Sequence, residues 1–499
     1  MALKAGSIIV LCGATLAAPI ARASDGERFD PFATYRTEPY HIDMREVLAN
    51  PGKYVAEPVE QPDLSKLGAQ PPVAAAPLPP GKLPPGWVQI GEVVQREEVA
   101  TGLKQVDPQP LPAWEDIEGN QYPRKGTVFL NFNGGMLLSG ADNSAESKST
   151  LARHKHPYPG YGGSESSALA LIQAVKEDMA AFGVRIVYEK RPSKTVPYTM
   201  AMIGGSWTDT NIGDPAGGVA PGTDCEDRGQ RNVVYAFDTS SATVSQEVAH
   251  AWGLDHTLGS DRIMSYQGGS NKKFGDNCQP LCEEECQGPG TIGCRLIHEI
   301  YCGEGSEAQN DLAELMKIFG GPEPDTEPPL VEIAEPVAET GVLELESDAS
   351  VNVVAKIKDN YGGVGWKMLI LKDGEVVLDQ VDYDRVGSWY LANMPDGTYE
   401  LTLEAEDHAD HVVQDKLTII VGSAAPEPTT GAGETDGATG GDPSGGSAGS
   451  DGATGTGEPI DGGGDDGSCE CSSSGGSTSG GLLALLGLAW AHRARRRRR

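Results

Sequence analysis

A short segment near the middle of the chain constrains the fold more than any other feature. Gln246 and His250 are four residues apart, so in a helix they share one face and could point at a common metal ion. Gly253 can adopt a left-handed backbone conformation that ends such a helix and folds the chain back. That turn would bring His256 to the same point. The spacing therefore predicts a helix and a sharp turn that together gather metal-ligating side chains.

The pattern resembles the metzincin signature H-E-x-x-H-x-x-G-x-x-H of zinc metallopeptidases. Four positions are in register, namely Glu247, His250, Gly253 and His256. Met264 resembles the Met-turn of that family, which would form a hydrophobic floor beneath the metal. The resemblance covers about residues 126–275 and implies an α+β domain with a mixed sheet and an active-site helix.

The same resemblance implies a role for each residue. Gln246, His250 and His256 would be the metal-facing set, with zinc as the cofactor. Glu247 would act as general base on a bound water, and Tyr266 would help to stabilise the oxyanion. The implied reaction is hydrolysis of a peptide bond in a peptide or protein substrate.

One position departs from the signature, because Gln246 stands where the family has its first zinc-binding histidine. An amide oxygen is a weaker zinc donor than imidazole, so metal affinity should fall. If Gln246 or another group completes the site, the enzyme can still turn over. His154 and His156 could in principle supply the missing ligand, but a basic surface loop is by far the simpler interpretation of these residues. Otherwise the chain is a noncatalytic surface protein that binds a peptide or protein ligand on an inactive metzincin fold.

The residues around the motif have the pattern of an α/β or α+β domain at 125–320. Apolar residues recur at helical spacing from 171 to 182. The run Asp238-Thr239-Ser240-Ser241 contains candidates for the N-cap of the helix that carries the motif. Three runs are typical of strands: 184–188, 199–203 and 232–237.

A second region, at 327–422, has the pattern of an antiparallel sandwich. Its alternating runs are separated by turn pairs such as Asp396-Gly397, and the region resembles bacterial immunoglobulin-like (Ig-like) domains. His408 and His411 within it are expected to be solvated loop residues. The expected alternating runs are 351–357, 367–371 and 399–403.

Cysteine usage indicates disulfides in an exported protein. Six cysteines in an oxidising compartment predict three disulfides, and fifteen pairings are open. A cysteine-based zinc site is the alternative, which export disfavours. The six candidates are Cys225, Cys278, Cys282, Cys286, Cys294 and Cys302.

The two ends of the chain predict export and surface attachment. Residues 1–23 have the features of a signal peptide. Residues 469–499 contain Cys469 and Cys471, a Gly/Ser spacer, a short apolar run and an arginine cluster, and resemble the MYXO-CTERM sorting signal. That resemblance implies cleavage and lipid attachment near those cysteines, and therefore a membrane partner at the cell surface or outer membrane, with release outside the cell also open.

Two further segments are expected to be disordered. Residues 24–124 are rich in proline, which predicts an open leader that serves as a propeptide or as a spacer. Residues 423–468 are acidic and rich in glycine, which predicts a flexible stalk.

The charge balance disfavours one class of partner. The chain has 72 acidic and 39 basic residues and a formal net charge of -33. Such an excess of negative charge repels nucleic-acid backbones. No nucleic-acid partner is expected.

Overall fold

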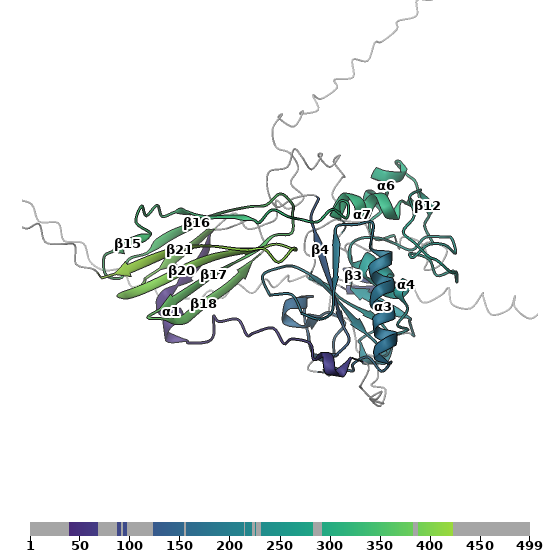
Figure 1. Ribbon diagram of the computed structural model, residues 1–499, viewed down its shortest axis with the longest axis horizontal. Helices are drawn as coiled ribbons and strands as arrows, with labels where there is room; N and C mark the ends of the chain where they lie inside the picture. Colours follow the sequence, from purple (N-terminus) through teal and green to yellow (C-terminus); the bar gives the residue numbers. More distant parts are fainter. Residues whose placement is uncertain are drawn as a thin grey trace, which may run out of the picture. The chain divides into compact units, whose positions relative to one another are not determined.

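The computed structural model describes residues 39–67, 87–90, 93–96, 123–153, 156–213, 215–221, 225, 231–282, 292–382 and 388–422. Within these residues the chain forms a mixed α/β region followed by a β-rich region (Figure 1). The mixed α/β character and the β-rich C-terminal part agree with the predicted order of folds.

A seven-stranded sheet forms the centre of the α/β region. Its strand order is β2-β3-β10-β11-β9-β4-β8. The strands β11, β9, β4 and the edge strand β8 are mutually parallel, whereas β10 pairs antiparallel to β11. The strands are β2 (Trp87–Ile90), β3 (Val93–Arg96), β4 (Gly126–Asn131), β8 (Val184–Val187), β9 (Thr199–Ile203), β10 (Gly218–Pro221) and β11 (Val233–Ala236).

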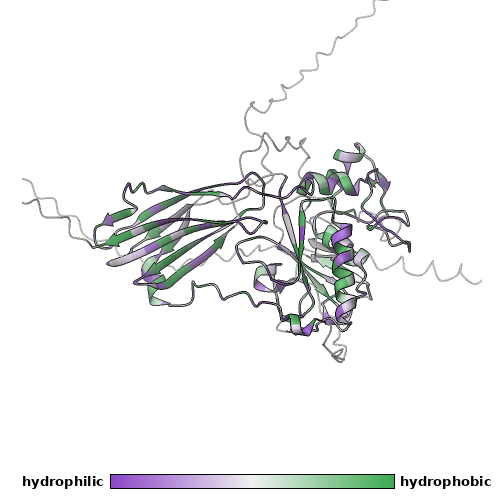
Figure 2. Cartoon of the chain, viewed as in Figure 1, coloured by the Kyte–Doolittle hydropathy of each residue, from purple (hydrophilic) through white to green (hydrophobic). Residues whose placement is uncertain are grey.

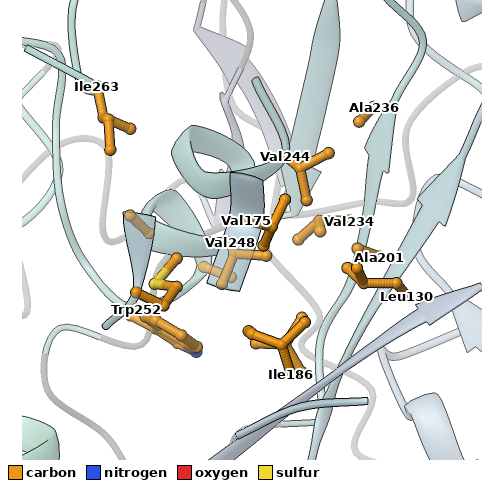
Figure 3. Close-up of a cluster of buried hydrophobic side chains, with 14 of the residues drawn as sticks. Leu130, Val175, Ile186, Ala201, Val234, Ala236, Val244, Val248, Trp252 and Ile263 are labelled. Atoms are coloured by element: carbon orange, nitrogen blue, oxygen red, sulfur yellow. The ribbon is translucent and has the colours of Figure 1, made fainter. Parts of the chain in front are cut away.

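Two helices, α3 (Glu165–Asp178) and α4 (Ser241–Ala251), pack on the sheet and against each other. Each begins at a serine whose hydroxyl accepts a backbone N–H: Ser164 caps α3 and Ser240 caps α4. Side chains such as Val175 of α3 and Val248 of α4 meet those of the strands in one buried cluster (Figure 3). The predicted strands at 184–188, 199–203 and 232–237 are confirmed to within one residue at each end. The two predicted helices are present as well, although α3 spans Glu165–Asp178 instead of 171–182.

Smaller elements complete the α/β region. They are β5 (Gly135–Ser139), η3 (Ser144–Glu146), β6 (Lys148–Ser149), β7 (His156–Tyr158), η4 (Trp207–Asp209), β12 (Gln279–Pro280), α6 (Arg295–Cys302), β13 (Ala308–Gln309) and α7 (Asp311–Phe319). The helices α6 and α7 contact each other and follow the candidate site in the sequence.

Two sheets around one core form the β-rich region, in the orders β1-β19-β16-β14 and β15-β21-β20-β17-β18. Trp366, Trp389 and Tyr399 are fully or almost fully buried between them. Figure 2 shows the mixture of hydrophobic and hydrophilic residues expected of strands with one buried face. The strands are β14 (Leu330–Glu335), β15 (Val342–Leu345), β16 (Val351–Lys358), β17 (Gly365–Lys372), β18 (Glu375–Asp382), β19 (Ser388–Ala392), β20 (Gly397–Glu406) and β21 (Val412–Val421).

Part of the leader belongs to this sandwich, so the prediction of an open chain throughout residues 24–124 is wrong. The strand β1 (Tyr40–Asp43) pairs in parallel with β19. The helix α1 (Met44–Ala49) follows, and Met44 and Val47 are 0% and 1% exposed in the sandwich core. The few apolar residues of this segment are sufficient to attach a strand and a helix to the sandwich, although the proline-rich sequence around them favours an open chain. The turn η1 (Leu64–Lys66) lies further along the leader.

The prediction that His408 is a solvated loop residue is also wrong. Its side chain is buried, and its Nδ1 lies 2.8 Å from Thr127 Oγ1. Burial, followed by the charges of Arg185 and Arg124, lowers the pKa of His408 to about 3. His411 is partly exposed, with Nδ1 2.7 Å from Asp407 Oδ2.

Several predictions lie outside the described residues. These are the signal peptide at 1–23, the stalk at 423–468 and the sorting segment with Cys469 and Cys471. Within the described ranges, no helix is both long and apolar enough to cross a membrane.

Because Met44 of the leader lies in the sandwich core, its replacement should destabilise the fold. Replacing Met44 by alanine should lower the free energy of unfolding by about 2–5 kcal/mol, because it leaves a cavity in a closed core. Urea unfolding, followed by the fluorescence of the buried tryptophans, would measure the change. Leu64, which is 46% exposed, provides the control: its replacement by alanine should cost less than about 1 kcal/mol. Equal effects of the two substitutions would contradict the role of Met44.

Candidate metal centre

The helix α4 carries the motif, and a glycine turn ends it. Gly253 has φ +110°, a conformation that side chains rarely adopt, and its N–H donates to the carbonyl of His250 over 3.0 Å. A Cβ at this glycine would lie 3.2 Å from the Cα of Cys225 and 3.3 Å from the Sγ of Cys294. Both the backbone conformation and the close packing therefore favour glycine at the turn.

The turn brings His250 and His256 together. Their Nε2 atoms are 3.1 Å apart and their ring centroids 4.3 Å apart, and the residues are 0% and 1% exposed. His250 Nδ1 lies 2.6 Å from the carbonyl oxygen of Leu254, which can only accept, so this nitrogen carries the proton. Burial, and then the neighbouring His256, hold the pKa of His250 well below its ordinary value. His250 is therefore neutral, and its Nε2 is the unprotonated ring nitrogen, 3.1 Å from His256 Nε2.

This pair of nitrogens fits a zinc ion. Two imidazoles bound to tetrahedral zinc at 2.0–2.1 Å have their nitrogens about 3.3 Å apart, close to the 3.1 Å observed. The bond from His250 to the Leu254 carbonyl is of the type that orients a ligand histidine and fixes its tautomer. The donor chemistry of the two residues therefore suits a metal.

Gln246 lies one helical turn before His250 on α4 and is 7% exposed. Its Nε2 is buried and has no hydrogen-bond partner. Rotation of the amide by 180° would exchange this nitrogen for the oxygen, which can bind a cation. The structure thus leaves the side chain with an unused polar atom, as a weak ligand would require.

Glu247 is fully buried against strand β10. A Cβ built on Gly218 would lie only 2.6 Å from Glu247 Oε1, so the start of β10 passes directly over the carboxylate. Any side chain at position 218 would displace it.

Tyr266 and Met264 flank the histidines differently. The Tyr266 ring stacks on that of His256, with centroids 3.9 Å apart and planes at 17°, and the residue is 40% exposed. Met264 is fully buried in the core, and its carbonyl accepts the N–H of Thr257 over 2.6 Å. Tyr266 therefore connects the buried pair with the molecular surface.

A buried network that the sequence did not reveal holds the loop before His256. His298 of α6 is 0% exposed, with Nε2 3.0 Å from Asp255 Oδ2 and Nδ1 2.8 Å from Glu314 Oε2. Burial alone would lower the pKa of His298, but the carboxylates of Glu314 and Asp255 outweigh it and raise the pKa to about 10. Gln309 adds two bonds to the backbone of Asp255, at 2.7 and 3.0 Å. In the sequence, His298 is only a histidine among helix-forming residues, and nothing local indicates its partners.

Disulfides link the same region. Cys225 is bonded to Cys294, and Cys278 to Cys302. Cys282 is disulfide-bonded as well, and its N–H donates to the carbonyl of His256 over 2.8 Å. The prediction of disulfides is confirmed for these five cysteines, whereas Cys286 lies outside the described residues. Disulfides indicate an exported protein.

The remaining histidine candidates are not shown at the centre. His156 lies in β7, with Nε2 3.8 Å from Asp209 Oδ1, and His154 is outside the described residues.

Carboxylates of Asp325, Asp359 and Asp407 form a separate group, within 4.8 Å of one another. Burial, and then the other two carboxylates, raise the pKa of Asp359 to about 7. Acidic groups commonly lie together in proteins without a bound ion, so this group by itself does not indicate a cation site.

Comparison with known proteins gives no family. No protein-family model and no curated protein matches the chain. Among solved structures, the fibronectin(III)-like modules of CbhA from Clostridium thermocellum are 21% identical over 19% of this chain and 46% of theirs, with a TM-score of 0.16. A nucleoside hydrolase-related hypothetical protein from Saccharophagus degradans is 14% identical over 38% and 48%, with a TM-score of 0.15. The chain thus spans less than half of either structure, and similarities this weak establish neither fold nor function.

The network around His298 predicts how stability depends on pH. The folded-state pKa of about 10 exceeds the ordinary value of about 6.5, so the protonated histidine stabilises the fold fully below pH 6.5. This contribution should be lost as the pH rises through 10, at up to about 1.4 kcal/mol per unit. Urea unfolding between pH 7 and 10 should show the decline in the wild type but not in His298→Gln. Parallel declines in both proteins would show that other groups cause it.

Proposed function

We propose that the chain is an exported, surface-anchored, metzincin-like zinc metallopeptidase that hydrolyses peptide bonds, with a divergent metal site. The observation that carries the proposal is the apposition of the His250 and His256 Nε2 atoms at 3.1 Å in a buried position. The resemblance of residues 246–256 to the metzincin signature supports the same assignment.

Each residue of the candidate centre has a separate role in the proposed reaction. His250 and His256 would hold the metal through Nε2, with Gln246 as a weak third donor through its amide oxygen. A bound zinc ion supplies an activated water and polarises the substrate carbonyl. Glu247 would accept a proton from that water, and its complete burial removes competing solvent from the carboxylate. Tyr266, which stacks on His256 and is partly exposed, would donate its hydroxyl to a developing oxyanion.

A noncatalytic binding protein is the second candidate function. The replacement of a ligand histidine by Gln246 supports it, as does the enclosure of Glu247 and both histidines, which are at most 1% exposed. In that case the domain would recognise a peptide or protein ligand at the cell surface without cleaving it. The two candidates differ in whether zinc binds and whether Glu247 matters.

The proposed location rests on several parts of the chain. The disulfides indicate export. Attachment to the membrane through Cys469 or Cys471 is part of the proposal and rests on the sequence of residues 469–499.

Metal content and peptide cleavage test the proposal together. The purified chain should bind zinc, and Glu247→Ala should lower its cleavage of a peptide library by about 10²–10⁴-fold, because a general base is removed. Glu177→Ala provides the control, because Glu177 is a solvent-exposed glutamate on α3 and its loss should leave the rate unchanged.

Gln246→His provides the complementary test. Restoring an imidazole to the metal-facing set should tighten zinc binding by at least about tenfold, as changes around a metal site commonly do, and should raise the cleavage rate. A wild-type protein without zinc and without Glu247-dependent cleavage would rule out the enzyme and leave the binding protein.

A further inference from the structure

One disulfide packs directly against the turn between the two histidines of the candidate centre. Gly253 lies midway between His250 and His256 in the sequence, and its φ of +110° favours glycine. A Cβ at this glycine would lie 3.3 Å from Cys294 Sγ and 3.2 Å from Cys225 Cα. These two cysteines are bonded to each other. The covalent bond therefore lies beside the residue at which the chain reverses direction toward His256.

Cys294 also holds the turn through its backbone. Its N–H donates to Asp255 Oδ2 over 3.3 Å, and the N–H of Gly293 donates to the same oxygen over 2.7 Å. Cys294 is the N-cap residue of α6 and makes no side-chain cap bond, so the Asp255 carboxylate is an acceptor for the amides at this helix end. Because Asp255 directly precedes His256, the start of α6 is bound to the loop that carries the second histidine.

The loop that this bond closes contains the whole candidate centre. Cys225 and Cys294 are 69 residues apart, and α4, both histidines and Met264 lie between them. A bond that closes a long loop removes more conformational freedom from the unfolded chain than one that closes a short loop. The bond also joins the connection between β10 and β11 to the start of α6, two segments that are far apart in the sequence.

The second disulfide provides a comparison, because the centre lies outside its loop. Cys278 and Cys302 are only 24 residues apart, and the loop between them begins after Met264. Cys278 is exposed, whereas Cys294 is fully buried. Loss of the bond between Cys278 and Cys302 should therefore leave the turn at Gly253 in place.

In the reduced chain the turn would lack its covalent closure. Hydrogen bonds such as those to Asp255 would have to hold it, and a single hydrogen bond contributes only modestly to stability. Free thiolates would also compete with the histidines for zinc, because thiolates are strong zinc ligands. Thiols stay reduced in the cytosol, whereas disulfides form and persist outside it. The compartment in which the bond forms therefore determines where the centre can form.

We propose that oxidation of Cys225 and Cys294 is the step that assembles the candidate centre, so that the two histidines are held together only in the exported protein. In this step the two thiols lose two protons and two electrons, and an S–S bond forms between them. The electrons reduce the disulfide of a thiol–disulfide oxidoreductase, whose S–S bond breaks and which takes up the two protons as two thiols.

The closure of the turn does not depend on metal chemistry, whereas its consequence for zinc binding rests on the proposed function. Because Cys294 is fully buried in the folded chain, its sulfur is shielded from reductants once the bond has formed. The step is therefore an irreversible part of folding, after which the centre stays assembled.

Two double variants of the full-length chain test this inference. C225S/C294S removes the bond at the turn, and C278S/C302S is the matched control that removes the other bond. Both variants lose two cysteines and leave no unpaired thiol from the bond that was removed, so competition of new thiolates for zinc is avoided.

Hydrogen exchange followed by mass spectrometry measures the turn without any metal. The amides of Gly253, Leu254 and Thr257 report on it, since all three donate to backbone carbonyls. They should exchange at least about tenfold faster in C225S/C294S than in the wild type, and within about twofold of the wild type in C278S/C302S. Equal rates in the two variants would overturn the proposal.

Circular dichroism establishes that each variant is folded. If C225S/C294S does not fold, graded reduction of the wild type decides instead, with alkylation and peptide mass spectrometry to identify the cysteines that have been reduced. Exchange at the turn should rise in step with alkylation of Cys225 and Cys294, while the circular dichroism is still that of the folded protein. A rise that follows Cys278 and Cys302, or that occurs only on global unfolding, would count against the proposal.

Zinc affinity, measured by competition with a chromophoric chelator, separates this inference from the proposed function. A loss of at least about tenfold in C225S/C294S but not in C278S/C302S supports both, since residues that orient metal ligands commonly change affinity by this much. Faster exchange at the turn, in a protein that binds zinc in none of its forms, supports closure by oxidation and counts against the peptidase. Equal zinc binding and equal exchange in all three proteins overturn the closure and leave the peptidase standing.

Discussion

A buried, positively charged histidine fixes the loop on which the candidate centre depends. His298 bridges Asp255 and Glu314, and Asp255 immediately precedes His256 in the sequence. A charged group without a partner at this depth would be strongly destabilising, so the three side chains stabilise one another only as a set. Because Asp255 also accepts the N–H of Gly293 over 2.7 Å, the loop has little freedom to move. The position of His256 opposite His250 therefore depends on helices α6 and α7 as much as on its own helix.

The segment that follows the motif in the sequence therefore also holds the backbone around His256 in place. The bond from Cys225 to Cys294 joins the loop beside Gly253 to the start of α6. The backbone of Cys282 contacts the carbonyl of His256. Disulfides and buried charged side chains thus both hold the turn between His250 and His256. Because a disulfide restricts the unfolded chain, it also stabilises this turn against local opening. In the proposed metal centre, where Gln246 would be a weak donor, such rigidity would favour metal binding, because the two histidines would already be held in place.

The sequence predicted those features that repeat with a regular spacing. Helix α4 follows from the four-residue spacing of the motif and the N-cap candidates before it, and the strand Thr199–Ile203 follows from a run typical of strands. The structure has both where they were expected. The convergence of His250 and His256 followed from four-residue spacing and a glycine. The burial of His408 and the pairing of β1 with β19 did not, because both depend on partners far away in the chain. Long-range pairing leaves no local pattern, and a proline-rich context concealed the apolar pair in α1.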